Sequence, residues 1–134
     1  MPLVDPLNRR IDYLRVSVTD RCNLACIYCK PRENMRCLPH GDILRFEEVL
    51  RIVSVAVSLG ITHVRVTGGE PLVRKGVVPF VGKLSELPGI TDVSITTNGV
   101  LLAEAAAGLR ASGIDRLNIS LDTLRPERVE TDVQ

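Results

Sequence analysis

The stretch Tyr13-Leu-Arg-Val-Ser-Val-Thr19 alternates apolar and polar side chains from its second residue onward. Successive side chains of a β-strand point to opposite sides, so this alternation predicts a strand with one apolar and one polar face. The apolar face holds Leu14, Val16 and Val18, and the polar face holds Arg15, Ser17 and Thr19.

Three later segments repeat this pattern and are separated by segments with helical spacing. The predicted strands are Ile61 to Thr67, Asp92 to Thr97 and Asp115 to Leu121. The predicted helices run from Phe46 to a stop at Gly60, from Val77 to Leu87 and from Leu101 to Ala111, and a fourth begins near Pro126. Strands that alternate with helices of about 10–15 residues are typical of an α/β fold whose parallel sheet is built from βα units.

Every predicted strand keeps a polar face, whereas parallel strands packed between two apolar layers usually read as continuous apolar runs. We therefore expect helices on one face of the sheet and a polar cavity on the other. This arrangement is that of a partial TIM-type (βα)n barrel, truncated to about four βα units. Ligands should bind at the carboxyl ends of the strands. The later polar faces hold His63, Arg65 and Thr67; Ser94, Thr96 and Asn98; and Asn118, Ser120 and Asp122.

The composition suits one globular domain, with 134 residues of which 45% are hydrophobic. The formal net charge of +1 argues against nucleic acid or a membrane surface as partner, because both favour a concentrated positive field. No apolar run is long enough to cross a bilayer, and the N-terminus lacks the apolar segment of a signal peptide. We expect a cytoplasmic protein.

Three of the four cysteines, Cys22, Cys26 and Cys29, follow the first strand in a C-x3-C-x2-C pattern. Such close spacing favours metal ligation over disulfides between distant parts of the chain. Structural zinc sites and all-cysteine iron–sulfur clusters use four ligands, so three thiolates leave one coordination position open for chemistry. The alternative is a zinc site completed by Cys37 or His40.

Other candidate residues also allow two interpretations. The Gly68-Gly69-Glu70-Pro71 turn lets a ligand approach the backbone closely, but it is also an ordinary way to connect a strand to a helix. Arg15 and Arg65 either pair with acidic residues or, because both lie on the polar face, form an anion site. Tyr28 packs the cysteine loop in the simplest interpretation, and Thr96 and Ser120 are common strand residues.

The cysteine pattern with Tyr28 before its last cysteine, together with the Gly-Gly-Glu-Pro turn, resembles the radical S-adenosylmethionine (SAM) superfamily. Within it, four segments are similar to the GTP 3′,8-cyclase family of molybdenum-cofactor biosynthesis, and the likeness extends from about Leu14 to Arg128. These segments are Leu14-Arg-Val-Ser-Val-Thr-Asp-Arg-Cys-Asn23, Arg65-Val-Thr-Gly-Gly-Glu-Pro-Leu-Val-Arg74, Thr96-Thr-Asn-Gly99 and Asn118-Ile-Ser-Leu-Asp122.

The resemblance implies a [4Fe–4S] cluster and SAM as cofactors, GTP as substrate and an external electron donor. It implies reductive cleavage of SAM at the cluster and conversion of GTP to (8S)-3′,8-cyclo-7,8-dihydroguanosine 5′-triphosphate, a lyase reaction in which the protein positions and shields the cofactor. By match of motif, the cluster ligands are Cys22, Cys26 and Cys29, the SAM contacts are Tyr28, Gly69 and Ser120, and the GTP contacts are Arg15, Arg65 and Thr96.

Members of this family continue through further βα units and carry a second cysteine triplet near the C-terminus, which this sequence lacks. We therefore expect residues 1–134 to be the N-terminal portion of a radical SAM core domain. The exposed fourth strand should promote aggregation unless a partner covers it, either in a homodimer or from a chain that supplies the C-terminal part. Two alternatives are another radical SAM activity, such as a peptide-modifying or activating enzyme, and a non-catalytic zinc-binding or interaction module.

Overall fold

Four parallel strands form one sheet in the computed structural model, which describes residues 3–29 and 36–132. The strands lie in chain order, so β1 and β4 are the two edges and the sheet does not close into a barrel. This confirms the predicted α/β class with an open parallel sheet. The strands are β1 (Tyr13–Ser17), β2 (His63–Thr67), β3 (Asp92–Thr97) and β4 (Arg116–Ile119).

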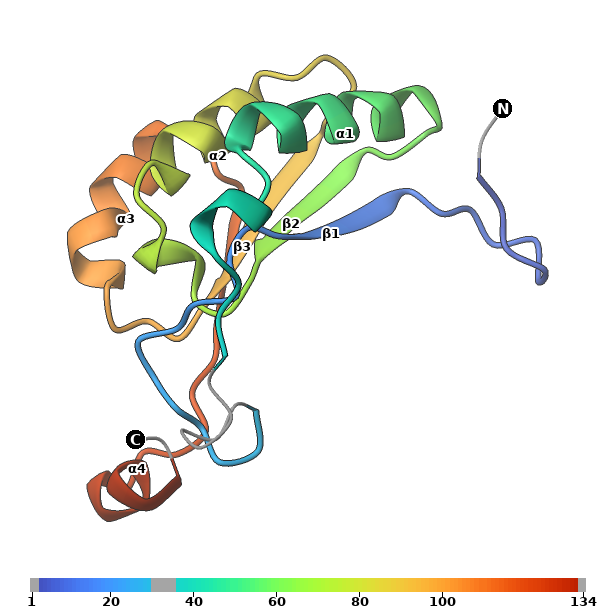
Figure 1. Ribbon diagram of the computed structural model, residues 1–134. Coiled ribbons are helices and arrows are strands. Elements are labelled where there is room, and N and C mark those ends of the chain that lie inside the picture. The colour runs from blue at the N-terminus through green and yellow to red at the C-terminus, as the bar shows by residue number, and fades with distance from the viewer. Residues whose placement is uncertain (1–2, 30–35, 133–134) are drawn as a thin grey trace.

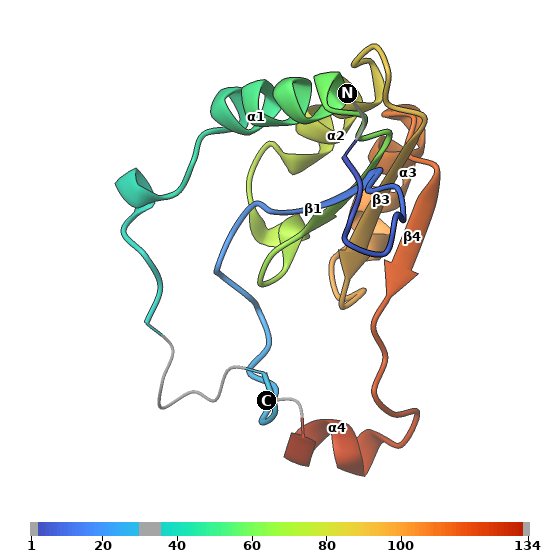
Figure 2. The same ribbon diagram turned by 90° about the vertical axis from the view of Figure 1, so that its right-hand side faces the viewer.

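The helices α1, α2 and α3 lie on one side of the sheet (Figure 1). Helix α4 lies beyond the carboxyl ends of the strands, at the same end of the molecule as the cysteine loop (Figure 2). Among the described residues, no helix has both the length and the apolar character needed to cross a membrane. The helices are α1 (Phe46–Ser58), α2 (Val77–Ser85), α3 (Leu102–Ala111) and α4 (Pro126–Asp132), with short 3-10 helices η2 (His40–Asp42) and η3 (Pro71–Val73).

Local sequence signals explain both ends of α1. At its start, the Glu48 carboxylate accepts a hydrogen bond from the backbone N–H of Arg45 at 2.7 Å, and Glu47 adds negative charge to the first turn, which the helix dipole favours. At its end, Gly60 adopts φ 102°, a left-handed conformation that glycine takes without steric cost. The helix therefore stops where the next strand has to begin.

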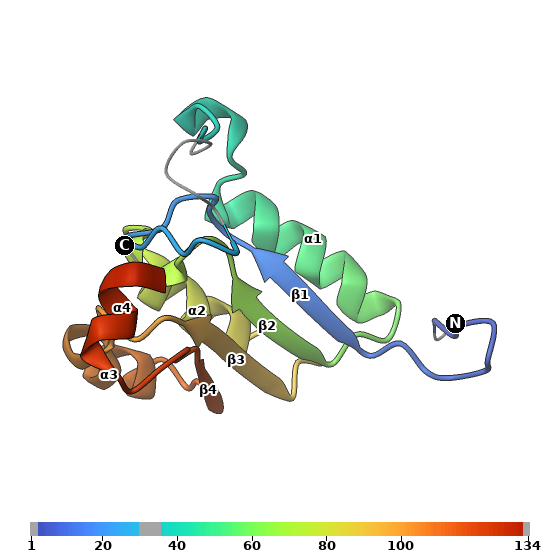
Figure 3. The ribbon, with the colours of Figure 1, turned by 90° about the horizontal axis from the view of Figure 1, so that it is seen from below.

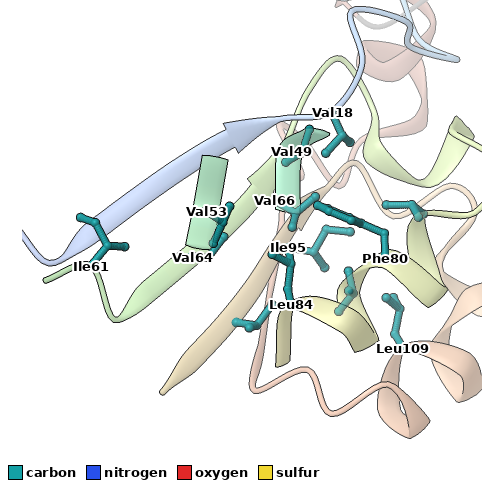
Figure 4. Packing of buried hydrophobic residues seen from close by; sticks show 13 residues of the cluster. Val18, Val49, Val53, Ile61, Val64, Val66, Phe80, Leu84, Ile95 and Leu109 are labelled. Atoms are coloured by element: carbon teal, nitrogen blue, oxygen red, sulfur yellow. The ribbon is translucent and has the colours of Figure 1, made fainter. Parts of the chain in front are cut away.

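The core lies between the sheet and these helices (Figure 4). The apolar faces of β2 and β3 contribute Val64, Val66 and Ile95, and α2 contributes Phe80 and Leu84, all buried. Phe80 also stacks on Phe46 of α1, with ring centroids 4.5 Å apart. This packing fixes the sheet as a platform for the loops at its carboxyl edge.

The opposite face of the sheet carries the polar side chains and is not covered by α1, α2 or α3 (Figure 3). This matches the predicted division into an apolar and a polar face, although two residues of the predicted polar faces, Thr19 and Ser94, are buried. Ser94 belongs to the polar face yet is fully buried. The reason is its neighbour, since the Arg65 Nε donates to Ser94 Oγ at 3.3 Å and the guanidinium covers it.

Several predicted elements are longer than the observed ones. The first and fourth strands were expected to reach Thr19 and Leu121, but β1 ends at Ser17 and β4 at Ile119. Pairing continues for one residue beyond each end, since the N–H of Val18 donates to Thr67 and that of Ser120 donates to Thr97. Helix α2 ends at Ser85, before the predicted Leu87, because the Leu87 N–H bonds only three residues back in a tightened turn.

Candidate functional site

The turn after β2 packs against the start of the cysteine loop. The N–H of Gly69 donates to the Thr19 carbonyl at 2.6 Å, and the N–H of Glu70 donates to the Arg21 carbonyl at 2.7 Å. A Cβ on Gly68 would lie 2.6 Å from the Thr19 carbonyl oxygen, and a Cβ on Gly69 would meet the backbone of Arg21 even more closely. Both glycines are needed because two backbones touch here, whatever their role toward a ligand.

Glu70 connects this turn to the end of β3. Its buried carboxylate accepts hydrogen bonds from the Thr97 hydroxyl at 2.8 Å, the Asn98 N–H at 2.7 Å and the Leu72 N–H at 3.0 Å. Three donors offset the cost of burying a carboxylate in a place where water does not reach. Glu70 therefore fixes the ends of β2 and β3 relative to each other.

Asn98 extends this network to the cysteine loop. Its side-chain Nδ2 donates to Asn23 Oδ1 at 2.8 Å and lies 3.8 Å from Cys22 Sγ. The backbone N–H of Leu24 also points at Cys22 Sγ, at 3.4 Å. Two N–H groups directed at one sulfur are hydrogen bonds of the kind that cluster-ligating sulfurs accept. The sequence placed Asn98 on a polar strand face and in one of the family segments, and nothing in it pointed to Cys22.

The three cysteines of the loop lie within the described residues, and no disulfide joins any of the four cysteines. Cys22 and Cys26 are half-buried, and Cys29 is exposed. In residues 3–29 and 36–132, no three His, Cys, Asp or Glu side chains are close enough together to hold a metal ion. The fourth zinc ligands considered above, Cys37 and His40, therefore do not join the loop cysteines in this conformation.

The donor set of the loop still fits a metal cluster by its chemistry. Three thiols stand within eight residues, one already receives two N–H groups, and thiolate sulfur is the ligand that iron–sulfur clusters use. The backbone on one side of the loop is fixed by the Gly68-Gly69 turn. Loading a cluster would require the loop to draw its three sulfurs together.

A cavity of about 210 Å³ lies beside Cys26 and brings Tyr28 and Ser120 to one place. The Tyr28 hydroxyl donates to Asp122 Oδ2 at 2.5 Å, joining the cysteine loop to the segment after β4. This bond to a carboxylate, helped by burial and by the nearby Cys26, raises the pKa of Tyr28 above its ordinary value. Asp122 was expected only as a polar-face residue. Its partner is 94 residues away in sequence, so no local signal could have identified the contact.

The expected anion-binding residues lie on the open face of the sheet. Arg15 of β1 stands directly opposite Arg65 of β2 in the strand register. The Arg65 guanidinium also lies over the ring of Tyr13, 5.3 Å from its centroid. Thr96, half-buried, is two residues beyond Ser94, the β3 partner of Arg65. No ion pair between described residues involves either arginine, so both positive charges are available to a ligand.

The chain matches the radical SAM superfamily over residues 16–133. The chain belongs to the radical SAM superfamily. This confirms the resemblance drawn from the cysteine motif and the Gly-Gly-Glu-Pro turn. SAM and a [4Fe–4S] cluster are the general cofactors of this superfamily.

Several relatives are GTP 3′,8-cyclases. The one from Heliobacterium modesticaldum is 59% identical over 126 residues, covering 94% of this chain and 38% of that protein. The one from Geobacter sulfurreducens is 56% identical over 127 residues, covering 95% of this chain and 39% of that protein. The chain thus spans less than two-fifths of the length of these relatives.

Two solved structures of the protein BtrN share the fold. The open conformation has a TM-score of 0.62 at 22% identity and covers 91% of this chain and 55% of BtrN. The complex of BtrN with AdoMet and 2-DOIA has a TM-score of 0.58 at 23% identity and covers 87% of this chain and 49% of BtrN. At this identity the likeness concerns the fold alone.

Proposed function

We propose that this chain is the SAM-cleaving, N-terminal portion of a GTP 3′,8-cyclase core domain that acts in molybdenum-cofactor biosynthesis. The observation that carries the proposal is the pair of arginines on the open face, Arg15 and Arg65, directly opposite each other and without an ion pair among the described residues. Two arginines at paired positions on neighbouring strands suit a triphosphate. The 59% identity to a GTP 3′,8-cyclase supports the same substrate.

Each residue has a stated role in this proposal. When bound, a [4Fe–4S] cluster supplies the electron for reductive cleavage of SAM, which starts the conversion of GTP to (8S)-3′,8-cyclo-7,8-dihydroguanosine 5′-triphosphate. Cys22, Cys26 and Cys29 would hold the cluster, Tyr28, Gly69 and Ser120 would contact SAM, and Arg15, Arg65 and Thr96 would bind GTP.

The surroundings of the cysteine loop support these roles. The Leu24 N–H and the Asn98 amide would orient Cys22 Sγ, and the cavity beside Cys26 offers Tyr28 and Ser120 to a ligand. The cavity is lined largely by apolar atoms of neighbouring side chains, which would exclude water. At about 210 Å³ it lies below the usual range of roughly 300–1,000 Å³ for small-molecule sites, so SAM would extend beyond it toward the open face.

The chain spans 38% of the length of its Heliobacterium relative, so the full reaction would need further residues. We propose that a chain carrying the C-terminal part, or a second copy in a homodimer, completes the site, and that an external protein donates the electron. A complementation assay with the missing part supplied separately would measure cyclase activity. Activity from the present chain by itself, at the level of the complemented sample, would contradict this division.

Electron paramagnetic resonance of the anaerobically reconstituted and reduced protein tests the cofactor assignment. We expect the signal of a reduced [4Fe–4S] cluster, and we expect it to change when SAM is added. Metal analysis of protein purified without oxygen separates this from the zinc alternative. One tightly held zinc with neither iron nor sulfide would reject the proposal in favour of a zinc-binding or interaction module.

The double variant Arg15→Ala/Arg65→Ala tests the substrate. Each charge-assisted bond to phosphate contributes about 1.5–3 kcal/mol, so GTP affinity should fall by roughly 100-fold or more. The response of the cluster signal to SAM should remain. Arg51→Ala, which removes an exposed arginine from α1, is the matched control and should bind GTP normally. Equal GTP binding by all three proteins would favour another radical SAM activity, such as a peptide-modifying or activating enzyme.

A further inference from the structure

A second cavity lies on the other side of the cysteine loop, between the segment before α1 and the turn that leads into α2. Its volume is about 380 Å³, within the range of small-molecule sites. Seven of the described residues line it, of which four are basic and none is acidic. The lining is Thr19, Arg21, His40, Ile43, Val73, Arg74 and Lys75.

Arg74 is held in one orientation at this cavity. Its guanidinium donates to the carbonyl of Val18 at 2.5 Å and to that of Leu44 at 2.7 Å, and lies over the ring of Phe46, 4.0 Å from the centroid. Partial burial lowers the pKa of Arg74, opposed by attraction to Glu47. A fixed and partly desolvated cation is ready to bind an anion without further loss of side-chain freedom.

Arg21 adds a donor with no hydrogen-bond partner among the described residues. Its Nε is completely buried and makes no such bond there. Its backbone is fixed, because its carbonyl accepts from Glu70 and its N–H donates to the Thr19 hydroxyl at 3.1 Å. Leaving a buried N–H unpaired is unfavourable, and Arg21 is also a lining residue of the cavity.

No carboxylate among the described residues lines the cavity, although Glu47 attracts Arg74. Among the described residues, the ion pairs within 4.0 Å involve none of Arg21, Arg74 and Lys75. Asp20 and Asp42 line a neighbouring cavity that shares Arg74 with this one, and Asp20 Oδ2 accepts the N–H of Leu38 at 2.6 Å. The lining of this cavity is therefore more basic than that of the neighbouring one.

We propose that this cavity is a second anion site, which binds the phosphate group of a small phosphorylated molecule. The planar guanidinium fork matches phosphate oxygens, and the volume leaves room for more than a bare ion. The site is distinct from the open face, because neither Arg15 nor Arg65 lines it. It stands independently of the proposed cyclase function.

Calorimetric titration of the full chain with inorganic pyrophosphate, at constant ionic strength, tests the site. The parent protein should bind pyrophosphate, and Lys75→Gln and Arg21→Gln should each weaken binding about tenfold or more. Lys83→Gln removes one positive charge from the exposed side of α2, away from the cavity, and should bind normally. If Lys83→Gln and Lys75→Gln weaken pyrophosphate binding equally, the protein attracts pyrophosphate only through its general positive charge, and the proposed site is rejected.

The double variant Arg15→Ala/Arg65→Ala separates this site from the proposed substrate face. Pyrophosphate binding that survives in the double variant and is lost in Lys75→Gln supports the second site. Binding lost in the double variant and retained in Lys75→Gln would assign the anion to the open face and reject the proposal. Circular dichroism checks that Arg21→Gln is folded. If Arg21→Gln is unfolded, Lys75→Gln still tests the site, because Lys75 is exposed. The proposal of a second anion site is also overturned if the parent protein binds no pyrophosphate at millimolar concentration.

Discussion

Strands β3 and β4 carry the same alternation of side chains yet have different surroundings. Ile95 of β3 is fully buried against the helices, whereas the apolar residues at and after β4, Leu117, Ile119 and Leu121, are 41%, 56% and 65% exposed. The strands pair directly, with Ile95 opposite Leu117. The difference teaches that alternation decides which face of a strand is apolar, while burial depends on the helix that packs over it.

The matched variants Ile95→Ala and Ile119→Ala test this comparison most strongly. Removing the Ile95 side chain leaves a cavity in a packed core and should lower the free energy of unfolding by about 2–5 kcal/mol. The half-exposed Ile119 loses less, under about 1 kcal/mol. Urea denaturation followed by circular dichroism measures both. Equal losses would mean that β4 is covered in solution, as a homodimer or another partner would do.

The ends of the two strands also differ, because a buried carboxylate ties down the end of β3. Glu70→Ala leaves the Thr97 hydroxyl and the Asn98 N–H without their acceptor and should cost about 2–4 kcal/mol of unfolding free energy. The control is Glu86→Ala, at an exposed position after α2, with an expected change below about 0.5 kcal/mol. A Glu70 variant as stable as the control would show that the strand end does not depend on these bonds.

Gly69→Ala tests whether the turn after β2 packs against the backbone of the cysteine loop. Its new methyl group would press into the backbone of Arg21, so we expect a loss of about 1–3 kcal/mol. Gly41→Ala is the control, since a methyl group there has nothing within 4 Å. Thermal unfolding of both variants provides the measurement. If Gly69→Ala unfolded at the parent temperature, the close contact with the cysteine loop would not exist in solution.

The segment after β4 is joined to the cysteine loop by the exposed bond between Tyr28 and Asp122, for which we expect the smallest effect. The hydrogen bond to Asp122 raises the pKa of Tyr28 in the folded state. Its contribution to stability is therefore fully present below about pH 10, the ordinary pKa of tyrosine, and is lost as the pH rises through the folded-state pKa. In Asp122→Asn, an alkaline absorbance titration should show Tyr28 ionising at lower pH than in the parent. Asp42→Asn should leave the titration unchanged, and a parent-like curve for Asp122→Asn would contradict the bond.

Much of the fold was predictable from local patterns. The period-two alternation placed Arg15 and Arg65 on one face, and the observed register sets them directly opposite each other. Helical spacing followed by glycine placed the end of α1 correctly near Gly60. Helix and strand ends were less accurate, because a last turn or a last pair of bonds depends on neighbours and not on the residues themselves.

The candidate site was predictable in its residues more than in its contacts. The cysteine loop, Tyr28 and Ser120 were selected from motifs, and their roles as ligands remain predictions. The pattern did not indicate that Asn98 reaches Cys22, that Asp122 binds Tyr28, or that Arg21 and Arg74 line one cavity. These contacts join segments that are far apart in the chain.

By itself, the sequence determined the order of strands and helices, the polar and apolar face of each strand, and the chemistry available at the strand ends. These properties depend on neighbouring residues, whose side-chain directions follow from backbone geometry alone. The tertiary structure decided which strand is covered, which carboxylate is buried, and where positive charge gathers. Glu70 meets Thr97, 27 residues away, only after the sheet register is set, because hydrogen bonds between distant segments require packing to bring them within reach.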